Sequence, residues 1–590
     1  MGKNFLTNGD GTRIPNEFNG IQVNHCKNPF CDNFGKPAAV DAIKRGRPKK
    51  GFETNRDSYT LNNSRPDHPQ LKCSICGKRT VIKSNQGISE ELKRITPERI
   101  YRFLCCPDTE CENNAIPVHF LSHYHKFGKT AKGDQRYKCR KCGKIFTNGK
   151  VIRRQKRSYK NREVFLNIVT KTPFRSLREV TGLTSKTLYR KIDFIHEQCL
   201  KFSSYREDKL KRMKFRQLNI ATDRQDYVIN WPNKFLKRNV VLQGVGSADN
   251  ASGYVFAMNV NFDPALTLAE LDEEIEKIND HKLKAPFRRY ARMWTSHDYS
   301  KRLKFKPASS GSLDSTQSEL KKLTLALEDV EPELLEVLPS SAQLPEYGVQ
   351  IHSEYTMYAH FFYLKKLLGH TGQLNFYMDR ETGINAALMA AFKNHFADRR
   401  ANAFYVIFDK GLEDDQRVNY VLECKQKYKK FLASRGLKDS PDAAVQMALY
   451  NLSIMNPTTE EWEHPFGTKG EPHKKVVRIV PDYTESEEEL AYQYLKGNLR
   501  GIDRFFNCIR RKLSPLERGI HTASGANGVW NGYAPYNPEM VQKYIDIYRT
   551  YYNYVPTPDK KETPAMRLKL ADGPVSVEDI IYFSARYKHR

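Results

Sequence analysis

Two aspartates stand where predicted strands end, and carboxylates in that position can hold metal ions. The segment 217–223 reads as a strand ending in Asp223, and the segment 373–379 reads as a strand ending in Asp379. In sheets with parallel strands, the carboxyl ends of neighbouring strands converge on one edge. Mg²⁺ prefers carboxylate oxygens. We therefore expect Asp223 and Asp379 to share metal ions, although a single aspartate at a strand end is common.

The elements around these aspartates predict how they meet. The strands expected at 239–246 and 253–260 would form hairpins beside the first one. Further along, strands alternate with helices, which implies a parallel section of the sheet. The elements expected there are a helix at 358–368, the strand 373–379, a helix at 384–396 and a strand at 403–408. This order predicts the opening of an RNase H-like α/β fold.

A third acid, Asp503, lies on a predicted helix at 499–512. Helical spacing places four polar side chains near one face, so that an acid could face metal ions while cations hold phosphate. These residues are Asp503, Asn507, Arg510 and Arg511. Glu489 and Glu517 are alternatives for the third acid. A surface acid on a basic helix is otherwise most often an ion-pair partner.

Eight cysteines form a duplicated pattern. Each copy reads Cys-x4-Cys, a loop, and then Cys-x2-Cys-Gly-Lys. The copies are Cys26, Cys31, Cys73 and Cys76, and then Cys106, Cys111, Cys139 and Cys142, with Cys105 as a possible replacement for Cys106. Four thiolates complete a closed tetrahedral zinc site of the structural kind. We therefore expect two structural Zn²⁺ ions, whose binding would supply folding free energy to these short polar segments.

The loop of the first copy contains a short basic motif at 44–50. Its core, Arg45-Gly46-Arg47-Pro48, looks like an AT-hook, which enters a narrow minor groove of DNA. So short a motif also occurs by chance, and an ordinary basic linker is the alternative. Arg45 and Arg47 are the DNA-binding candidates in this loop.

Residues 161–192 have the pattern of a helix-turn-helix. Gly182 would form the turn, and Thr184 would cap the second helix. The side chains expected to pack inward are Leu177, Val180, Leu183, Leu188 and Ile192. Those expected in the major groove are Ser185, Lys186, Tyr189 and Arg190. A plain helical hairpin is the alternative, but the basic residues on both sides, Arg153, Arg154, Lys156 and Arg157 among them, favour DNA binding.

The overall charge also points to nucleic acid. The 590 residues include 97 Lys+Arg and 68 Asp+Glu, a formal net charge of +29. The segment 126–162 holds fifteen basic residues and only Asp134 as an acid. Such a cluster predicts salt-dependent binding to a polyanion. No segment approaches the length of an apolar membrane span, and cysteines in short pairs without a secretion signal favour a reducing compartment, the cytosol or nucleoid.

Four segments resemble insertion-sequence transposases. The second cysteine copy, within HKFGKTAKGDQRYKCRKCGKIFTNGK, resembles the zinc-finger segment at the head of these bacterial enzymes. The pattern Ile-acid-x5-Ile-basic-basic around Asp503 resembles the DDE transposase and integrase superfamily. The segments 530–538 and 551–568 look like the carboxyl ends of such transposases. The chain departs from the family in having Asp503 where glutamate is usual, and in the long spacing from Asp379 to Asp503.

The resemblance implies a DNA transposase with an RNase H-like core. Asp223, Asp379 and Asp503 would be the catalytic residues and would hold two Mg²⁺ or Mn²⁺ ions. The partners would be double-stranded DNA, at the element's ends and at the target, and further copies of the chain in a synaptic assembly. No membrane partner is expected.

The expected domains follow the chain in order. They are a first zinc module at 23–86, a second zinc module at 104–150, a helix-turn-helix at 155–205, a catalytic domain at 215–515 with insertions at about 266–365 and 415–480, and a carboxyl-terminal region at 516–590. Two other functions remain open at this stage. One is a DNA-binding regulator that has lost cutting, and the other is a nuclease or resolvase with the same fold. An RNA-binding role fits the charge, but the chain lacks an RRM-type stacking signature.

Overall fold

The structure is a computed structural model of the whole chain. It describes residues 12–41, 57–62, 68–97, 104–118, 120–131, 135–147, 155–230, 239–304, 343–381, 383–456, 460–482, 486–521, 529–557 and 561–584. The chain divides into two compact units. Unit 1 contains Met1–Thr96, Lys214–Asn507 and Arg518–Gln542, and unit 2 contains Pro97–Met213, Cys508–Glu517 and Lys543–Arg590.

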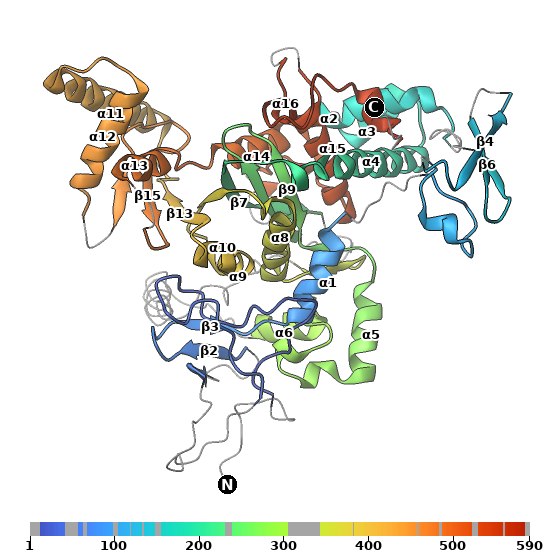
Figure 1. The fold of residues 1–590 in the computed structure, drawn as a ribbon, viewed down its shortest axis with the longest axis horizontal. Coiled ribbons are helices and arrows are strands. Elements are labelled where there is room, and N and C mark those ends of the chain that lie inside the picture. Colours follow the sequence, from blue (N-terminus) through green and yellow to red (C-terminus); the bar gives the residue numbers. More distant parts are fainter. Residues whose placement is uncertain are drawn as a thin grey trace, which may run out of the picture. The chain divides into compact units, whose positions relative to one another are not determined.

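Unit 1 is built on a mixed seven-stranded sheet (Figure 1). Its strand order is β14-β15-β13-β12-β7-β8-β9. The strands are β7 (Gln217–Ile229), β8 (Val240–Asp249), β9 (Val255–Val260), β12 (Gln373–Met378), β13 (Ala401–Ile407), β14 (Glu461–Glu463) and β15 (Lys475–Arg478). The expected hairpins and the expected parallel section are both present. β7, β8 and β9 pair antiparallel, whereas β12 pairs parallel with β7, and β13 parallel with β12.

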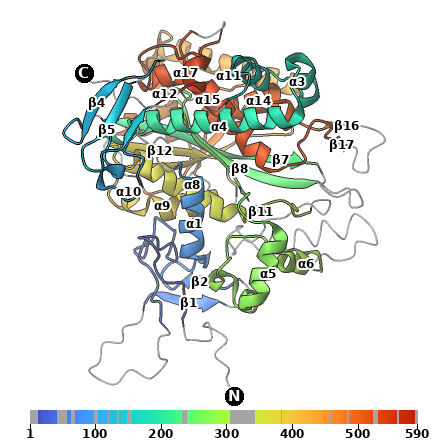
Figure 2. The same ribbon diagram turned by 90° about the vertical axis from the view of Figure 1, so that its right-hand side faces the viewer.

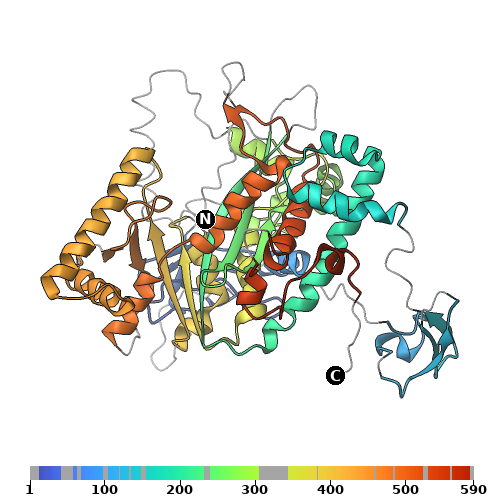
Figure 3. The ribbon, with the colours of Figure 1, turned by 90° about the horizontal axis from the view of Figure 1, so that it is seen from above.

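Helices cover both faces of this sheet. The alternation of side chains along β8 defines the faces, because successive strand residues point to opposite sides. Ser247 faces α8 (Ser353–Leu368), and its Oγ lies 2.8 Å from Nε2 of His360. Gly246 faces α14 (Arg500–Lys512), where a Cβ on the glycine would lie 2.7 Å from Cδ1 of Ile502. α14 lies over the strands in the view from above (Figure 3).

The helix next to β12 and β13 is interrupted. The helix expected at 384–396 is α9 (Ile384–Ala391) followed by α10 (Lys393–Ala397), with a break at Phe392. Phe392 is buried and its ring centroid lies 4.9 Å from that of Phe376 on β12. Packing against the sheet therefore takes precedence over helix continuity at this position.

The first cysteine module belongs to unit 1. Its strands are β1 (Tyr59–Asn62), β2 (Gln70–Cys73) and β3 (Arg79–Val81), and they lead to α1 (Asn85–Ile95), which packs beside α8 (Figure 2). Lys83 at the start of this segment pairs with Glu354 of α8 at 2.8 Å. On α1 itself, the fully buried Glu91 accepts from Thr356 of α8 and pairs with Arg94 and Arg292.

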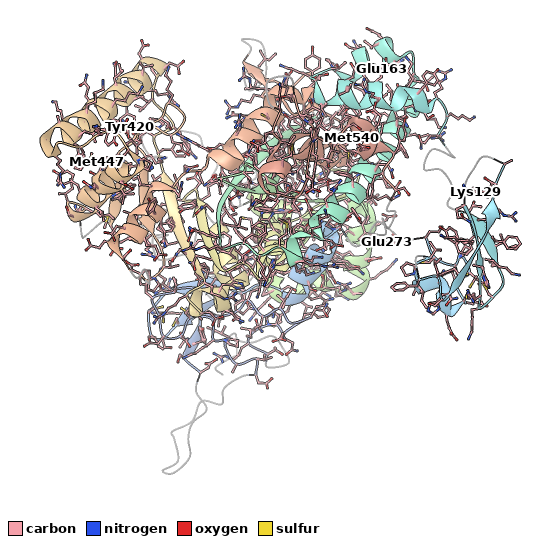
Figure 4. The ribbon with its side chains drawn as sticks, turned by 45° about the horizontal axis from the view of Figure 1, so that its top comes forward. Lys129, Glu163, Glu273, Tyr420, Met447 and Met540 are labelled. Carbon is pink, nitrogen blue, oxygen red and sulfur yellow. The ribbon has the colours of Figure 1, made fainter. Side chains whose placement is uncertain are left out.

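The segments expected as insertions contain elements that pack on the sheet. α8 begins at Ser353 and packs on β8 and β9, so the last part of the segment 266–365 contacts the sheet directly. The segment before it carries β10 (Phe262–Asp263), α5 (Leu268–Ile278) and α6 (Ser296–Lys304). In the second insertion, β15 pairs with β13 and so extends the sheet. The remainder includes α11 (Asp414–Arg435) and α12 (Pro441–Ser453), on which Tyr420 and Met447 lie (Figure 4).

Unit 2 combines segments that are far apart in the sequence. It contains the second cysteine module, with strands β4 (Tyr124–Lys129), β5 (Gln135–Cys139) and β6 (Ile145–Thr147). It also contains α2 (Asn161–Val169), α3 (Phe174–Thr181) and α4 (Ser185–Glu207), and α2 and α4 pack with α17 (Val577–Ile581). α15 (Glu539–Tyr554) joins them from Lys543 onward. The residues of the expected carboxyl-terminal region 516–590 divide between the two units.

Buried contacts join α4 and α15 of unit 2. Arg549 of α15 pairs with Glu207 of α4 at 2.6 Å, and both side chains are buried. His196 lies 3.0 Å from Asp546.

None of the helices in the described part of the chain combines the length and the apolar character that a membrane span requires.

Candidate functional site

Three carboxylates meet at the junction of β7 and β12. Asp223 lies in β7, and Asp379 directly follows β12, whose last residue Met378 pairs with Thr222. The parallel pairing therefore sets the two aspartates side by side. Glu381 joins them, and one carboxylate oxygen from each of the three residues lies within 4.8 Å of the others.

The charge of Asp503 on α14 affects the same carboxylates, as the pKa of Asp223 shows. The pKa of Asp223 is raised well above its usual range, first by burial and then by the charge of Asp503, with smaller contributions from Glu381 and Asp379. A hydrogen bond from the backbone N–H of Arg224 opposes this rise. The sheet explains the approach of Asp503. Asp223 pairs with Gly246, and Gly246 leaves room for Ile502, the residue before Asp503.

Two cations lie against the acids. Nζ of Lys410, which follows β13, lies 2.6 Å from Asp379, and Nε of Arg224 lies 2.9 Å from Glu381. Burial would lower the pKa of Lys410, but the hydrogen bond to Asp379 and the charges of Asp379, Asp223 and Glu381 raise it overall. The acidic site thus attracts positive charge.

The donor set fits a hard divalent cation. Carboxylate oxygens from adjacent residues suit Mg²⁺ or Mn²⁺, which keep several waters and need few protein ligands. The partial burial of Asp223 gives a reason for such an ion, because a carboxylate with restricted access to water is costly unless a cation compensates its charge. No histidine or cysteine belongs to the cluster, which sets it apart from the two cysteine sites.

The predictions for this site need one correction and one addition. β7 does not end at Asp223 but continues to Ile229, because it stays paired with β8 along its whole length. The rival acids lie elsewhere: Glu517 belongs to unit 2 and pairs with Lys171, and Glu489 lies in the first turn of α13 (Glu487–Leu495). Glu381 was missed. Its signal was its position two residues after Asp379, directly beyond the strand end.

The four cysteines of the first copy converge. Sγ of Cys26 lies 3.6 Å from Sγ of Cys76, and Sγ of Cys31 lies 3.8 Å from Sγ of Cys73. Thiolates around one tetrahedral Zn²⁺ with Zn–S of about 2.3 Å are about 3.8 Å apart. These four cysteines could therefore hold zinc. Burial would raise the pKa of Cys73, but N–H donors from Cys76, Asn33 and Ile75 lower it to about 7, which favours a thiolate ligand.

The second copy has the same geometry. Sγ of Cys106 lies 3.4 Å from Sγ of Cys142, and Sγ of Cys111 lies 3.8 Å from Sγ of Cys139. Against the effect of burial, N–H donors from Cys142 and Asn113 lower the pKa of Cys139 to about 6. Cys105 stays outside the group, as its role as a spare implied.

Two residues beside the cysteines are duplicated as well, and the sequence interpretation gave them no role. Asn33 and Asn113 each donate from Nδ2 to a cysteine sulfur, to Cys73 at 3.6 Å and to Cys139 at 3.2 Å. The hydroxyls of Tyr59 and Tyr124 accept from the backbone N–H of Cys26 and Cys106. Such partners orient the ligands of a metal site.

The predicted turn between two helices is present in unit 2. Gly182 has φ of +62° at the end of α3, and the side chain of Thr184 accepts from the N–H of Thr187 to cap α4. Leu177, Leu183, Leu188 and Ile192 are buried as expected. Val180 was wrongly placed in the core, because it is 60% exposed and the inward position is taken by Thr181. The hydroxyl of Thr181 donates to the carbonyl of Leu177 at 2.6 Å.

The predicted DNA-contact residues of this segment lie at its surface. Lys186, Tyr189 and Arg190 are exposed and Ser185 is half-buried, while the ring of Tyr189 stacks on that of Phe174. Lys191 was missed: it is buried and donates to the carbonyls of Lys156 and Arg157 and to Asn161. It thereby fixes the basic segment beside α4.

The remaining candidates divide into two groups. Arg510 and Arg511 lie in the last turn of α14 and belong to unit 2. Arg45, Arg47, Arg153 and Arg154 lie outside the described residues.

No protein-family model and no curated protein matches this chain.

Proposed function

We propose that this chain is a DNA transposase of the DDE superfamily with an RNase H-like catalytic core. The strand order β9-β8-β7-β12-β13 supports this fold, since three antiparallel strands are followed by two strands parallel to the first. The observation that carries the proposal is the convergence of Asp223, Asp379 and Glu381, with the charge of Asp503 acting on Asp223.

Each acid has a role in the proposed reaction. Asp223, Asp379 and Asp503 hold two Mg²⁺ or Mn²⁺ ions, and Glu381 adds a fourth carboxylate. When bound, the ions activate water or a 3′-hydroxyl and stabilise the negative charge that develops on the phosphodiester. Burial disfavours the charged form of Asp223, so a bound metal ion would stabilise this carboxylate by compensating its charge. Lys410 and Arg224 are placed to contact phosphate once the ions compete for their carboxylate partners.

The other modules select the DNA. The two cysteine sites would hold structural Zn²⁺, and α4 would place Lys186, Tyr189 and Arg190 in the major groove at the element's ends. Arg510 and Arg511 on α14 would hold phosphates. Double-stranded DNA of the ends and of the target is the substrate, and several copies of the chain would assemble on it. The reaction would take place in the nucleoid of a bacterial cytoplasm.

The test is metal-dependent nicking and strand transfer on DNA that flanks the gene. Asp223→Asn, Asp379→Asn and Asp503→Asn keep side-chain size and remove the charge. Each is expected to lower both reactions at least about a hundredfold while binding of the ends persists. Asp398→Asn is the matched control, because Asp398 is an exposed acid of unit 1 outside the cluster. A wild-type protein that binds the ends but never cuts them in Mg²⁺ or Mn²⁺ contradicts the proposal.

A DNA-binding regulator without cutting activity is the second candidate. The observation that favours it is a pair of ion pairs: Lys410 neutralises the charge of Asp379, and Arg224 neutralises the charge of Glu381. The same assay separates the two functions, because a regulator binds the ends with unchanged affinity when Mg²⁺ is removed and leaves both strands intact.

A further inference from the structure

The duplicated cysteine modules can be compared residue by residue. Tyr59 pairs with Cys73 in the first module, and Tyr124 pairs with Cys139 in the second. The third strand follows in the same register, since Lys72 pairs with Arg79 and Lys138 pairs with Ile145. The first module therefore serves as an internal reference for the second.

One face of the sheet differs between the two modules. The face that points away from the cysteine sulfurs is partly covered in the first module, where Gln70 is 3% exposed and its partner Val81 is 2% exposed. Arg136 and Thr147 take these positions in the second module, and neither is buried.

In the second module this face is open. We call it the outer face, and its residues are His125, Phe127, Arg136, Lys138, Ile145 and Thr147. Phe127 is 42% exposed and Ile145 is 41% exposed. Cζ of Arg136 lies 5.1 Å from the centroid of the Phe127 ring, and Nζ of Lys138 lies 5.8 Å from it. An exposed aromatic ring thus stands between two cations.

The charges of the module are separated. The outer face carries no carboxylate. The acids among the module's described residues, Asp108, Glu110 and Glu112, lie around the Cys106–Cys111 turn, where Lys144 and Lys141 pair with Asp108 and Glu112 at 4.0 and 3.2 Å. No ion pair engages Arg136 or Lys138 in the described part of the chain. Lys126 and Lys129 add positive charge along β4, with Lys129 at the strand's end (Figure 4).

This combination fits nucleic acid with unpaired bases. A base stacks on an exposed aromatic side chain, and cations beside the ring contact the phosphates on either side. Within a duplex, the faces of each base are covered by the neighbouring bases, so the ring of Phe127 has no base face to stack on. The cations would still bind the phosphates of a duplex. We propose that the outer face of the second module binds single-stranded DNA, with one base on Phe127 and the backbone on Arg136 and Lys138.

The inference deepens the proposed function and rests on its DNA-binding part. An enzyme that cuts the two strands of a duplex at staggered positions exposes single-stranded ends, and a surface for unpaired bases would hold such an end. The site is separate from the acidic cluster, so it can be measured without cleavage.

The experiment uses the full-length protein with zinc and two fluorescent probes. One probe is a blunt duplex, and the other is the same duplex with a short single-stranded 3′ tail that carries 2-aminopurine. Phe127→Leu keeps the apolar surface but removes the aromatic ring. It is expected to weaken binding of the tailed probe about tenfold, to abolish the quenching of 2-aminopurine, and to leave blunt-duplex affinity unchanged. Zinc content verifies that the module stays folded.

The charged residues have their own variant and control. Arg136→Gln with Lys138→Gln is expected to weaken both probes and to lower the salt dependence of tail binding by about 1.4, the value for two phosphate contacts on a single strand. Lys72→Gln with Arg79→Gln changes the first module near the equivalent positions, and we expect wild-type affinity for both probes.

Three outcomes overturn the inference. They are unchanged tail binding by Phe127→Leu, an equal loss on both probes, and an effect of the first-module control as large as that of the second-module variant. The proposed function fails separately. A wild type that binds the tailed probe through Phe127 but never cuts DNA contradicts the transposase and leaves the outer face as a single-strand site.

Discussion

Ile502 of α14 lies against Gly246 of β8 because that glycine has no side chain. A Cβ on Gly246 would lie 2.7 Å from Cδ1 of Ile502 and 2.8 Å from the sulfur of Met258, closer than carbon atoms normally come. Gly246 pairs with Asp223, and Ile502 precedes Asp503. The glycine therefore determines how closely one acid of the candidate site approaches another.

Gly246→Val tests this relationship. Its side chain would push α14 from the sheet, and overpacking of this kind costs about 1–3 kcal/mol. We expect a lower midpoint of thermal unfolding and a weaker response to Mn²⁺, because Asp503 moves away from Asp223. Gly470→Ala is the control, since a Cβ at Gly470 would meet no atom within 4 Å. An unchanged midpoint in Gly246→Val would show that α14 is not tightly packed there.

The raised pKa of Asp223 predicts a pH-dependent stability. A carboxyl whose pKa is higher in the folded than in the unfolded state favours folding below the ordinary value of 3.8, and this contribution is lost as pH rises through the raised pKa. At neutral pH without metal, Asp223→Asn should therefore be more stable than wild type. The expected gain is at least about 1 °C, the shift that about 1 kcal/mol produces in a unit of about 400 residues.

The pH and metal responses identify the cause. The stability gain of Asp223→Asn should shrink as pH falls toward 3.8, and Mg²⁺ should raise the melting temperature of wild type but not that of the variant. Differential scanning calorimetry at several pH values measures both. A gain of the same size at every pH would assign the effect to something other than the buried charge.

The ion pair between Lys410 and Asp379 predicts that Lys410 competes with a metal ion for this carboxylate. Its ammonium lies 2.6 Å from Asp379, and its side chain is 65% exposed. Because an exposed ion pair of this kind is worth at most about 1 kcal/mol, Lys410→Gln should tighten Mn²⁺ binding up to about fivefold. Calorimetric titration measures this change, with Lys425→Gln on the exposed side of α11 as the control. In the proposed reaction the same variant should cut DNA more slowly, since it lacks a phosphate contact. Weaker metal binding would contradict the competition.

The two cysteine modules should differ in what their loss destabilises. Ser84 and Tyr355 share a hydrogen bond, Lys83 pairs with Glu354, and Lys27 with Tyr358, so the first module holds α8 directly. Cys73→Ser should therefore increase hydrogen exchange in α8. Cys139→Ser, the equivalent change in the second module, should leave exchange in α8 unchanged. If hydrogen exchange in α8 were the same in Cys73→Ser and Cys139→Ser, the first module would not support the sheet.

Much of the candidate chemistry could be predicted from local patterns. Cysteine spacing placed both sets of four thiolates, because a metal site built from short loops depends on neighbours in the chain. Strand and helix periodicity placed Asp223 and Asp379 near strand ends, although β7 runs past the first of them. The turn at Gly182 and the cap at Thr184 were equally local, since each depends on a few backbone angles and one side-chain hydrogen bond.

The tertiary structure decided what depends on distant contacts. Lys410 lies against Asp379 because β12 and β13 lie side by side, which periodicity in one segment cannot reveal. Val180 is exposed because only one stripe of the short helix α3 faces the core of its unit.

The two cysteine modules show most clearly which features follow from local sequence and which from tertiary packing. The sequence by itself determined that there are two similar cysteine sites, since ligand spacing is local. Only packing decided that the first joins the sheet through α8 while the second has an open basic face, because burial depends on what the rest of the chain brings against each surface.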